Sequence, residues 1–309
     1  MTSSDLTSSP VVEAPAQTAP RDWQARLRRF GYTAHPATEL RERLVPRFPK
    51  ASVWDWLGPL LVAALAGVIR FWHLGRPRAV VFDETYYAKD AWSLLRLGYE
   101  GTWPDRKIAD PQILADPQVV SLSDTGTFVA HPPMGKWVIA LGEWMFGLTP
   151  FGWRFMTAAL GTLSVLMLCR IGRRLFRSTL LGCLAGALLA MDGLHVVMSR
   201  TALLDLVVMF FVLAAFGSLL VDRDRARSRL AAALPVGEDG RARPDVHTGD
   251  HAGTGSRPWR LAAGVFLGLA AATKWNGLYV LVFFVVLTVK MKTSAPAAWP
   301  VPPAPTWRC

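Results

Sequence analysis

The chain alternates long apolar stretches with short polar ones, and the first apolar stretch runs from Val53 to Trp72. It has the roughly 20 residues that a helix needs to cross the hydrocarbon core of a bilayer. Tryptophans mark both ends, Trp54 and Trp56 at its start and Trp72 at its close. Aromatic residues anchor spans at the membrane interface in this way. The pattern predicts a first membrane-spanning helix.

Similar apolar stretches return later in the chain. We expect spans at about Phe151–Cys169, Thr179–Val197 and Ala202–Val221, followed by two short apolar segments, Leu261–Ala272 and Leu278–Thr288. Continuous apolar stretches of this length are typical of membrane helices. The pattern predicts an all-α polytopic membrane protein with about six spans.

The stretch between the first two spans, residues 73–149, has weaker helical patterns. Thr85–Gly98 has apolar residues at helical spacing, and Gly135–Gly147 is apolar but too short to cross a bilayer. Both are predicted to be amphipathic helices lying in the membrane interface. Residues 101–130 contain Pro, Asp and Gly and are expected to be irregular.

The positions of the basic residues predict the orientation. Blocks of Arg and Lys precede the first span, follow the second and end the last apolar segment, and such blocks favour the cytoplasmic side. We therefore expect a cytoplasmic N-terminus and an external loop at 73–149. Residues 1–50 are expected to be a disordered basic tail, 51–292 one transmembrane domain, and 222–258 a poorly ordered cytoplasmic loop. Residues 293–309 form an irregular Pro-rich tail, either native or the product of a frameshift or truncation.

Composition supports the membrane interpretation. Of 309 residues, 51% are hydrophobic and only 18% are charged, against about 25% in ordinary soluble domains. The net charge of +11 would suggest nucleic acid in a soluble protein. Here the basic residues lie beside apolar segments and no nucleic-acid-binding signature accompanies them, so topology and anionic lipid explain them. The three cysteines form no CxxC pair, which argues against a disulfide framework or a metal site.

Two polar clusters in the expected external loop are the best candidates for chemistry. Asp83 and Glu84 are adjacent carboxylates soon after the first span. A partly desolvated carboxylate at the membrane interface can act as a general base, whereas the alternative is an ordinary acidic helix N-terminus. His131 precedes two prolines and Lys136. The prolines fix the backbone and hold His131 in place, or they simply form a rigid turn.

Four further ionisable residues lie in or beside apolar segments, where charges are costly. Arg154 needs an anionic partner, either Glu84 or a lipid phosphate, unless it extends to the interface. Arg200 and Asp205 are five residues apart, which misses helix-face spacing and favours separate partners. Lys274, between the two short apolar segments, faces the external surface or a phosphate. No GxGxxG, Walker or HExxH motif is present, so a nucleotide-using soluble transferase is unsupported.

Taken together, these residues resemble the protein O-mannosyltransferase family of polytopic GT-C-type glycosyltransferases. The resemblance covers about residues 50–292. The basic, Ala- and Arg-rich composition of the chain is similar to that of actinobacterial members. The matching motifs, in order, are Phe82-Asp83-Glu84, His131-Pro132-Pro133-Met134-Gly135-Lys136, Gly152-Trp153-Arg154, Ser199-Arg200-Thr201-Ala202-Leu203-Leu204-Asp205 and Thr273-Lys274-Trp275-Asn276-Gly277.

The resemblance implies a GT-C-type transmembrane catalytic domain. It would transfer mannose from polyprenyl-phosphate mannose to Ser or Thr hydroxyls of exported proteins, with inversion, at the external face of the cell membrane. No cofactor, metal or nucleic acid is implied. The implied roles are catalysis for Asp83 and Glu84, donor-phosphate binding for Arg154, Arg200 and Lys274, and acceptor or loop positioning for His131, Lys136 and Asp205.

Other functions stay open. Family members are longer, so this chain resembles an N-terminal portion and an inactive truncated membrane protein is one alternative. Another lipid-phosphate-sugar transferase, such as an aminoarabinose transferase acting on lipid A, is a second. A transporter half is disfavoured, because it would place polar residues at mid-membrane whereas most charges here gather at one face.

Overall fold

The computed structural model describes the helical parts of the chain and some of the segments between them. The described residues are 37–45, 52–103, 122–123, 125–234, 236, 240 and 255–293, with side chains as far as 286. Both expected terminal tails fall largely outside this range, as do residues 104–121 of the loop that was expected to be external. The chain divides into a larger unit, Arg47–Ser228 with Thr254–Cys309, and a smaller one, Met1–Pro46 with Arg229–Gly253.

Helices occur at every apolar segment that the pattern predicts. Those long and apolar enough to cross a membrane are α3 (Trp54–Phe71), α7 (Pro150–Phe176) and α10 (Leu204–Ala233). The described residues therefore hold three candidate spans, or up to four if the bent pair α8 (Thr179–Met191) and α9 (Gly193–Ser199) counts as one. The all-α membrane architecture is confirmed.

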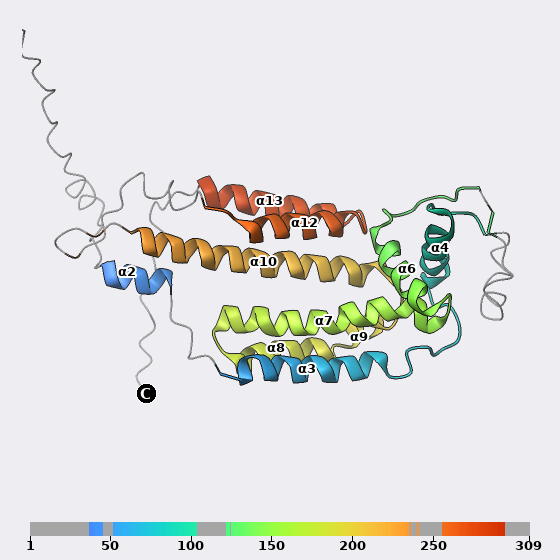
Figure 1. Cartoon of the computed structure of the whole chain (residues 1–309), viewed down its shortest axis with the longest axis horizontal. Helices are drawn as coiled ribbons and strands as arrows, with labels where there is room; N and C mark the ends of the chain where they lie inside the picture. The colour runs from blue at the N-terminus through green and yellow to red at the C-terminus, as the bar shows by residue number, and fades with distance from the viewer. Residues whose placement is uncertain are drawn as a thin grey trace, which may run out of the picture. The chain divides into compact units, whose positions relative to one another are not determined.

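The last two apolar segments form shorter helices, α12 (Pro258–Ala271) and α13 (Gly277–Thr293). In the larger unit, α3, α7, α8, α10, α12 and α13 run side by side (Figure 1). That α12 and α13 each cross the membrane stays a prediction.

The third expected span is broken. α8 and α9 meet at Asp192 with a bend of 66°. Asp192 is in an extended conformation and its side chain accepts a hydrogen bond from the His195 amide at 2.7 Å, so it ends one helix and caps the next. Beyond α9 the chain reaches the start of α4, where the Ala202 amide donates to Glu84.

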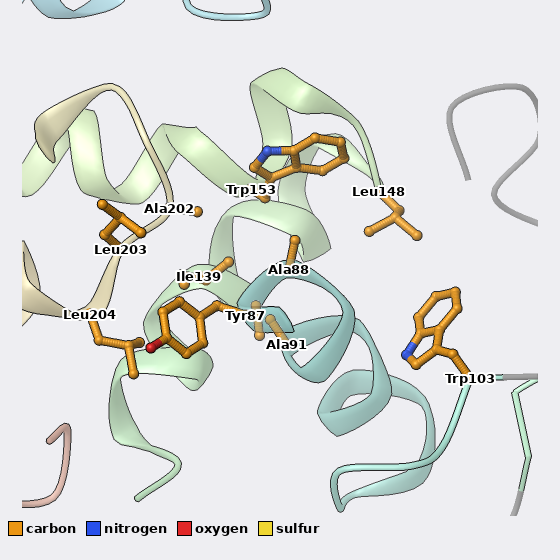
Figure 2. Close-up of a cluster of buried hydrophobic side chains, with 11 residues drawn as sticks. Tyr87, Ala88, Ala91, Trp103, Ile139, Leu148, Trp153, Ala202, Leu203 and Leu204 are labelled. Atoms are coloured by element: carbon orange, nitrogen blue, oxygen red, sulfur yellow. The ribbon is translucent and has the colours of Figure 1, made fainter. Parts of the chain in front are cut away.

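Two short helices cross that end of the bundle, as Figure 1 shows: α4 (Glu84–Leu97) and α6 (Met134–Phe146). Both were expected to within one residue at either end, and their place in the membrane interface stays a prediction. Ala88 and Ala91 of α4 pack with Ile139 of α6, Trp153 of α7 and Leu204 of α10 in one buried cluster (Figure 2). Small residues on α4 let the helices approach closely, so this cluster fixes the platform on which the candidate residues stand.

The expected irregular segment has one ordered pairing. Gly101 and Gly126 form an antiparallel bridge, and the Thr102 and Thr127 amides donate to Thr125 and Glu100 carbonyls at 2.8 and 2.9 Å. The pairing closes the ends of the loop and holds Glu100 near α6.

Two expectations of disorder are wrong within the described residues. α10 continues through residues 222–233, expected as loop, because Arg and Ala favour the helix. α2 (Ala37–Leu44) lies inside the expected tail. In the smaller unit, Leu40 and Leu44 of α2 pack against Leu234.

The bundle depends on a close approach of α7 and α8. Gly182 and Gly186 on α8 are four residues apart, and a Cβ at Gly182 would lie 2.5 Å from the Cys169 carbonyl oxygen and 2.7 Å from the Arg173 amide of α7. This is the small-residue spacing by which membrane helices bring their backbones together.

We expect Gly182→Ala to lower the stability of the chain by about 1–3 kcal/mol, because its methyl group meets backbone that cannot move aside. Thermal unfolding in detergent measures the change. The control is Gly264→Ala in α12, where nothing lies within 4 Å of the added Cβ and alanine should be neutral or slightly stabilising. Equal midpoints for the two variants would contradict the close approach.

Candidate active site

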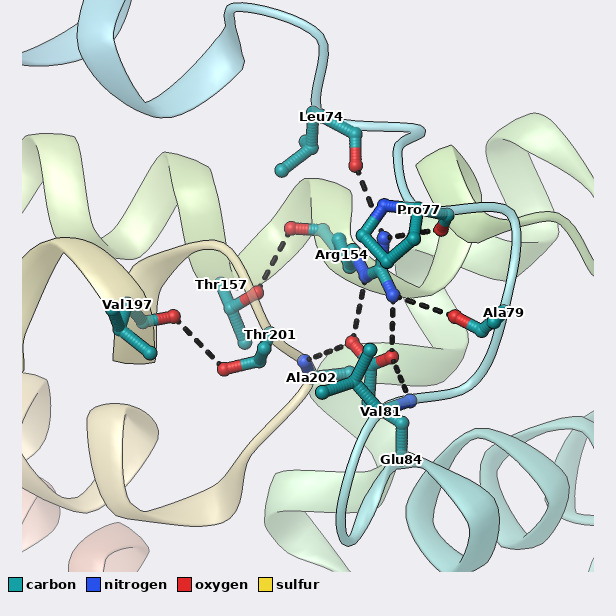
Figure 3. Close-up of polar contacts among 10 residues, drawn as sticks. All are labelled: Leu74, Pro77, Ala79, Val81, Glu84, Arg154, Thr157, Val197, Thr201 and Ala202. Atoms are coloured by element: carbon teal, nitrogen blue, oxygen red, sulfur yellow. Dashed lines mark hydrogen bonds and ion pairs between the residues drawn. The ribbon is translucent and has the colours of Figure 1, made fainter.

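A buried ion pair joins the segment that follows α3 to the bundle. The Arg154 Nε and Nη2 atoms donate to the Glu84 Oε1 and Oε2 atoms, each at 2.7 Å (Figure 3). The two side chains are 1% and 0% exposed. Glu84 also accepts from the amides of Val81 and Ala202, both at 2.9 Å. Its carboxylate is therefore fully engaged.

Arg154 is equally engaged. Beyond Glu84 it donates to the carbonyls of Leu74, Pro77 and Ala79 at 3.4, 3.0 and 2.8 Å. A guanidinium has five N–H groups, and each has a partner here. Of the two anionic partners that the sequence allowed, the geometry supports Glu84, and it does not support donor-phosphate binding by Arg154.

Asp83 is placed differently from its neighbour. It occupies the N-cap position of α4, but its side chain makes no capping hydrogen bond. The preceding Phe82 has φ 55° and is 77% exposed. A bulky residue in this left-handed region is uncommon and costs on the order of 1–3 kcal/mol. This backbone directs Glu84 into the interior while Asp83 stays half-buried.

The residues around Asp83 come from four elements. Tyr87, one helical turn further along α4, hydrogen-bonds to Asp83 and points toward Leu204 at the start of α10 (Figure 2). The His131 ring lies 6.3 Å from the Tyr87 ring, centroid to centroid. Next to them, the Lys274 Nζ atom donates to both Asp205 oxygens at 2.8 and 2.9 Å. We call Asp83, Tyr87, His131, Asp205 and Lys274 the Asp83 cluster.

The electrostatics of the cluster fix two protonation states. Burial, with the negative charges of Asp83 and Asp205, raises the pKa of Tyr87 to about 12, so its hydroxyl stays a donor at neutral pH. Burial, with the positive charges of Lys274 and Lys136, lowers the pKa of His131, so its imidazole is neutral at pH 7. The His131 Nδ1 atom is buried and has no hydrogen-bond partner among the described residues.

The charge of Lys136 is neutralised by carboxylates outside this cluster. The side chain is 1% exposed and pairs with Glu100 at 2.5 Å and Asp90 at 2.9 Å. Burial raises the pKa of Asp90 against the opposing effect of Lys136. The contacts tie α4, the Gly101–Gly126 bridge and α6 together, which supports the expected loop-positioning role.

Arg200 lies in a different cluster. Its Nη1 atom donates to the carbonyls of Ile69 and Arg70 at 2.8 and 3.0 Å, at the end of α3. Arg200 and Asp205 thus have separate partners, as their spacing predicted. Beside Arg200, the buried Arg70 side chain lies 2.7 Å from His195 Nδ1 and 3.3 Å from Ser199 Oγ.

Sequence reasoning missed Tyr87 and Arg70. Tyr87 follows Asp83 by four residues on a predicted helix, which places both on one face. Arg70 is an arginine inside an apolar span, which is itself a signal. Among the described residues, no group of three or more His, Cys, Asp or Glu side chains could hold a metal ion.

Comparison with known proteins identifies relatives of this arrangement. Residues 60–233 match the family described as dolichyl-phosphate-mannose-protein mannosyltransferase. The chain is 41% identical over 257 residues to a polyprenol-phosphate-mannose–protein mannosyltransferase of Mycolicibacterium smegmatis, covering 82% of this chain and 45% of that protein. It is 36% identical over 248 residues to the Corynebacterium glutamicum protein of the same name, and the match covers 79% of this chain and 43% of that protein.

A solved structure shares the fold. The Saccharomyces cerevisiae protein O-mannosyltransferase Pmt1-Pmt2 complex bound to the sugar donor superposes with a TM-score of 0.54 at 21% identity, covering 84% of this chain and 30% of that chain. The chain spans about half the length of the curated relatives it matches, 45% and 43% in the two cases above.

We expect Arg154→Met to destabilise the chain by about 3–5 kcal/mol, because it leaves the Glu84 charge buried and unpaired. Thermal unfolding in detergent measures this. The matched control is Arg174→Met, which breaks a pair with Asp224 whose side chains are 34% and 24% exposed and should cost no more than about 1 kcal/mol. A loss of stability as small as that of the control would contradict the structural role and favour donor-phosphate binding by Arg154.

Proposed function

Because the chain belongs to the dolichyl-phosphate-mannose-protein mannosyltransferase family, we propose that it contributes the catalytic base to protein O-mannosylation. The donor is a polyprenyl-phosphate mannose and the acceptor a Ser or Thr hydroxyl of an exported protein. The acceptor oxygen attacks the anomeric carbon, the bond from that carbon to the phosphate oxygen breaks, and the configuration inverts. Asp83 takes the hydroxyl proton and the lipid phosphate leaves.

The contrast between the two adjacent carboxylates carries this assignment. Glu84 is 0% exposed and its oxygens accept from Arg154, Val81 and Ala202, so it cannot receive a proton from a substrate without losing an ion pair. Asp83 is half-buried, has no ion pair among the described residues and belongs to the Asp83 cluster. A base must reach the proton that it abstracts, and Asp83 meets this requirement.

Lys274 is the best candidate for the departing phosphate. Its side chain is 22% exposed and its partner Asp205 is 44% exposed, so a ligand can approach both. The phosphate gains charge as the glycosidic bond breaks, and a fixed cation there stabilises the transition state more than the ground state. Asp205 then orients the Lys274 ammonium group. Arg154 acts through Glu84 as a positioning residue, and phosphate binding by Arg200 stays a prediction.

His131 fits an acceptor-positioning role. Its neutral imidazole carries a buried Nδ1 atom without a partner among the described residues, and an incoming hydroxyl could satisfy it. The chain is a multi-pass membrane protein. On the positive-inside rule its N-terminus is cytoplasmic and the Asp83 cluster faces the exterior of the cell membrane.

We expect Asp83→Asn to lower mannose transfer by at least about 100-fold with normal membrane insertion, because amide nitrogen cannot accept the proton. Membranes that contain the chain are given radiolabelled polyprenyl-phosphate mannose and a Ser/Thr/Pro-rich peptide. Asp192→Asn is the control, since asparagine caps a helix as well as aspartate.

Wild-type transfer by Asp83→Asn would remove the general-base role. No transfer by the unmodified chain would contradict activity of this portion by itself. Transfer of label from the donor to a second lipid, and not to the peptide, would favour a lipid-modifying transferase of the aminoarabinose-transferase type.

We expect Lys274→Gln to lower kcat on the order of 100-fold, because it removes one fixed charge from the developing phosphate. Transfer rates at varied donor and peptide concentrations measure the effect. Lys274→Arg keeps the charge and should retain most activity. An unchanged rate for Lys274→Gln would take this residue out of the phosphate site.

A further inference from the structure

A second polar site lies on the other side of the loop that carries Asp83 and Glu84. A cavity of about 520 Å³ is lined by His73, Arg76 and Arg78 from that loop and by Thr149, Pro150 and Phe151 at the start of α7. We call it the arginine hollow. It shares no residue with the Asp83 cluster, which is built from α4, α10 and the segments before α6 and α13.

The loop backbone that carries Arg76 and Arg78 is held in place by Arg154 of α7. Arg154 donates to the carbonyls of Leu74, Pro77 and Ala79, so the loop is fixed to the bundle at three points around Arg76 and Arg78. Figure 3 shows these carbonyls converging on the Arg154 guanidinium. The Arg76 and Arg78 side chains are exposed and reach the cavity from a fixed backbone.

The charge of the hollow is uncompensated. Neither the Arg76 nor the Arg78 side chain has a hydrogen bond or ion pair with any described residue, and no carboxylate lines the cavity. The first turn of the 27-residue helix α7 adds the positive end of its dipole from the opposite wall. The site is therefore suited to an anion, and arginine pairs favour the oxygens of phosphate.

The surroundings indicate where that phosphate comes from. Trp72, 68% exposed, ends the apolar stretch of α3, and its ring lies 5.1 Å from the His73 ring. An exposed tryptophan at the end of a span marks the headgroup level of a bilayer. The floor of the hollow is apolar, because Pro150 lines it beside Phe151, whose ring packs 5.0 Å from that of Phe146. A cationic rim over an apolar floor fits a lipid headgroup with its glycerol backbone.

We propose that the arginine hollow binds the phosphate of an anionic phospholipid. The lipid clamps the outer side of the loop whose inner side is held by Arg154, and so stabilises the segment that leads to Asp83. This binding is separate from transfer, and its test does not depend on enzymatic activity.

The experiment follows thermal unfolding of the purified chain in detergent as phosphatidylglycerol or phosphatidylcholine is titrated into the micelles. We expect phosphatidylglycerol to raise the midpoint by several degrees more than phosphatidylcholine, because a ligand that binds only the folded state stabilises it. In the double variant Arg76→Gln/Arg78→Gln, the half-saturating amount of phosphatidylglycerol should rise by about 30-fold. Arg76→Lys/Arg78→Lys should keep most of the effect.

The control removes the same charge elsewhere. Arg177→Gln/Arg227→Gln changes two arginines outside the hollow and should keep the phosphatidylglycerol effect. An unchanged effect in Arg76→Gln/Arg78→Gln, or an equal loss in the control, would overturn the proposal. Inorganic phosphate that protects as well as phosphatidylglycerol would show a site for a soluble anion and overturn the lipid assignment. If the double glutamine variant does not fold, the single variants Arg76→Gln and Arg78→Gln take its place, and an unchanged phosphatidylglycerol effect in both would overturn the proposal.

Discussion

The ion pair between Glu84 and Arg154 is the contact on which the candidate site depends. Burying two charges costs several kcal/mol, and only complete hydrogen bonding offsets that cost. Here every donor of Arg154 and both oxygens of Glu84 have partners. Those partners belong to the loop after α3, to the start of α4, to α7 and to the turn before α10. One pair therefore joins four parts of the chain, and each of them would be free to move without it.

The pair also gives neighbouring carboxylates different chemistry. Glu84 provides rigidity, and Asp83 has a fixed position because it directly precedes Glu84 on the same backbone. The left-handed conformation of Phe82 is the local cost of turning one side chain inward and the other toward the Asp83 cluster. Such strain persists only where surrounding contacts hold the backbone in the strained conformation. Here the hydrogen bonds of Arg154 hold it. Reactivity and stability are thus divided between two adjacent residues.

The apolar pattern predicted the helices well because burial and hydrocarbon thickness act locally along the chain. It also predicted that Arg200 and Asp205 take separate partners. It could not identify those partners, since Lys274 is 69 residues from Asp205. For Arg154 it left two choices open, a lipid phosphate and Glu84, which lies 70 residues away. The bend at Asp192 was missed because an apolar stretch does not reveal a capping carboxylate. The continuation of α10 was missed because polarity was taken for disorder, although Arg and Ala both favour helix.

The distances along the chain between Glu84 and its partners also set an order of assembly. Arg154 is synthesised 70 residues after Glu84, and the Ala202 amide follows Glu84 by 118 residues. At typical translation rates the second interval lasts on the order of 10 s. Until Arg154 is in place, the loop that carries Asp83 lacks its anchor and Glu84 is an unpaired acid; the Ala202 contact follows later still. The full set of contacts around Glu84 is therefore completed late, and a chain that ends before Ala202 would hold Glu84 through Arg154 without the Ala202 amide.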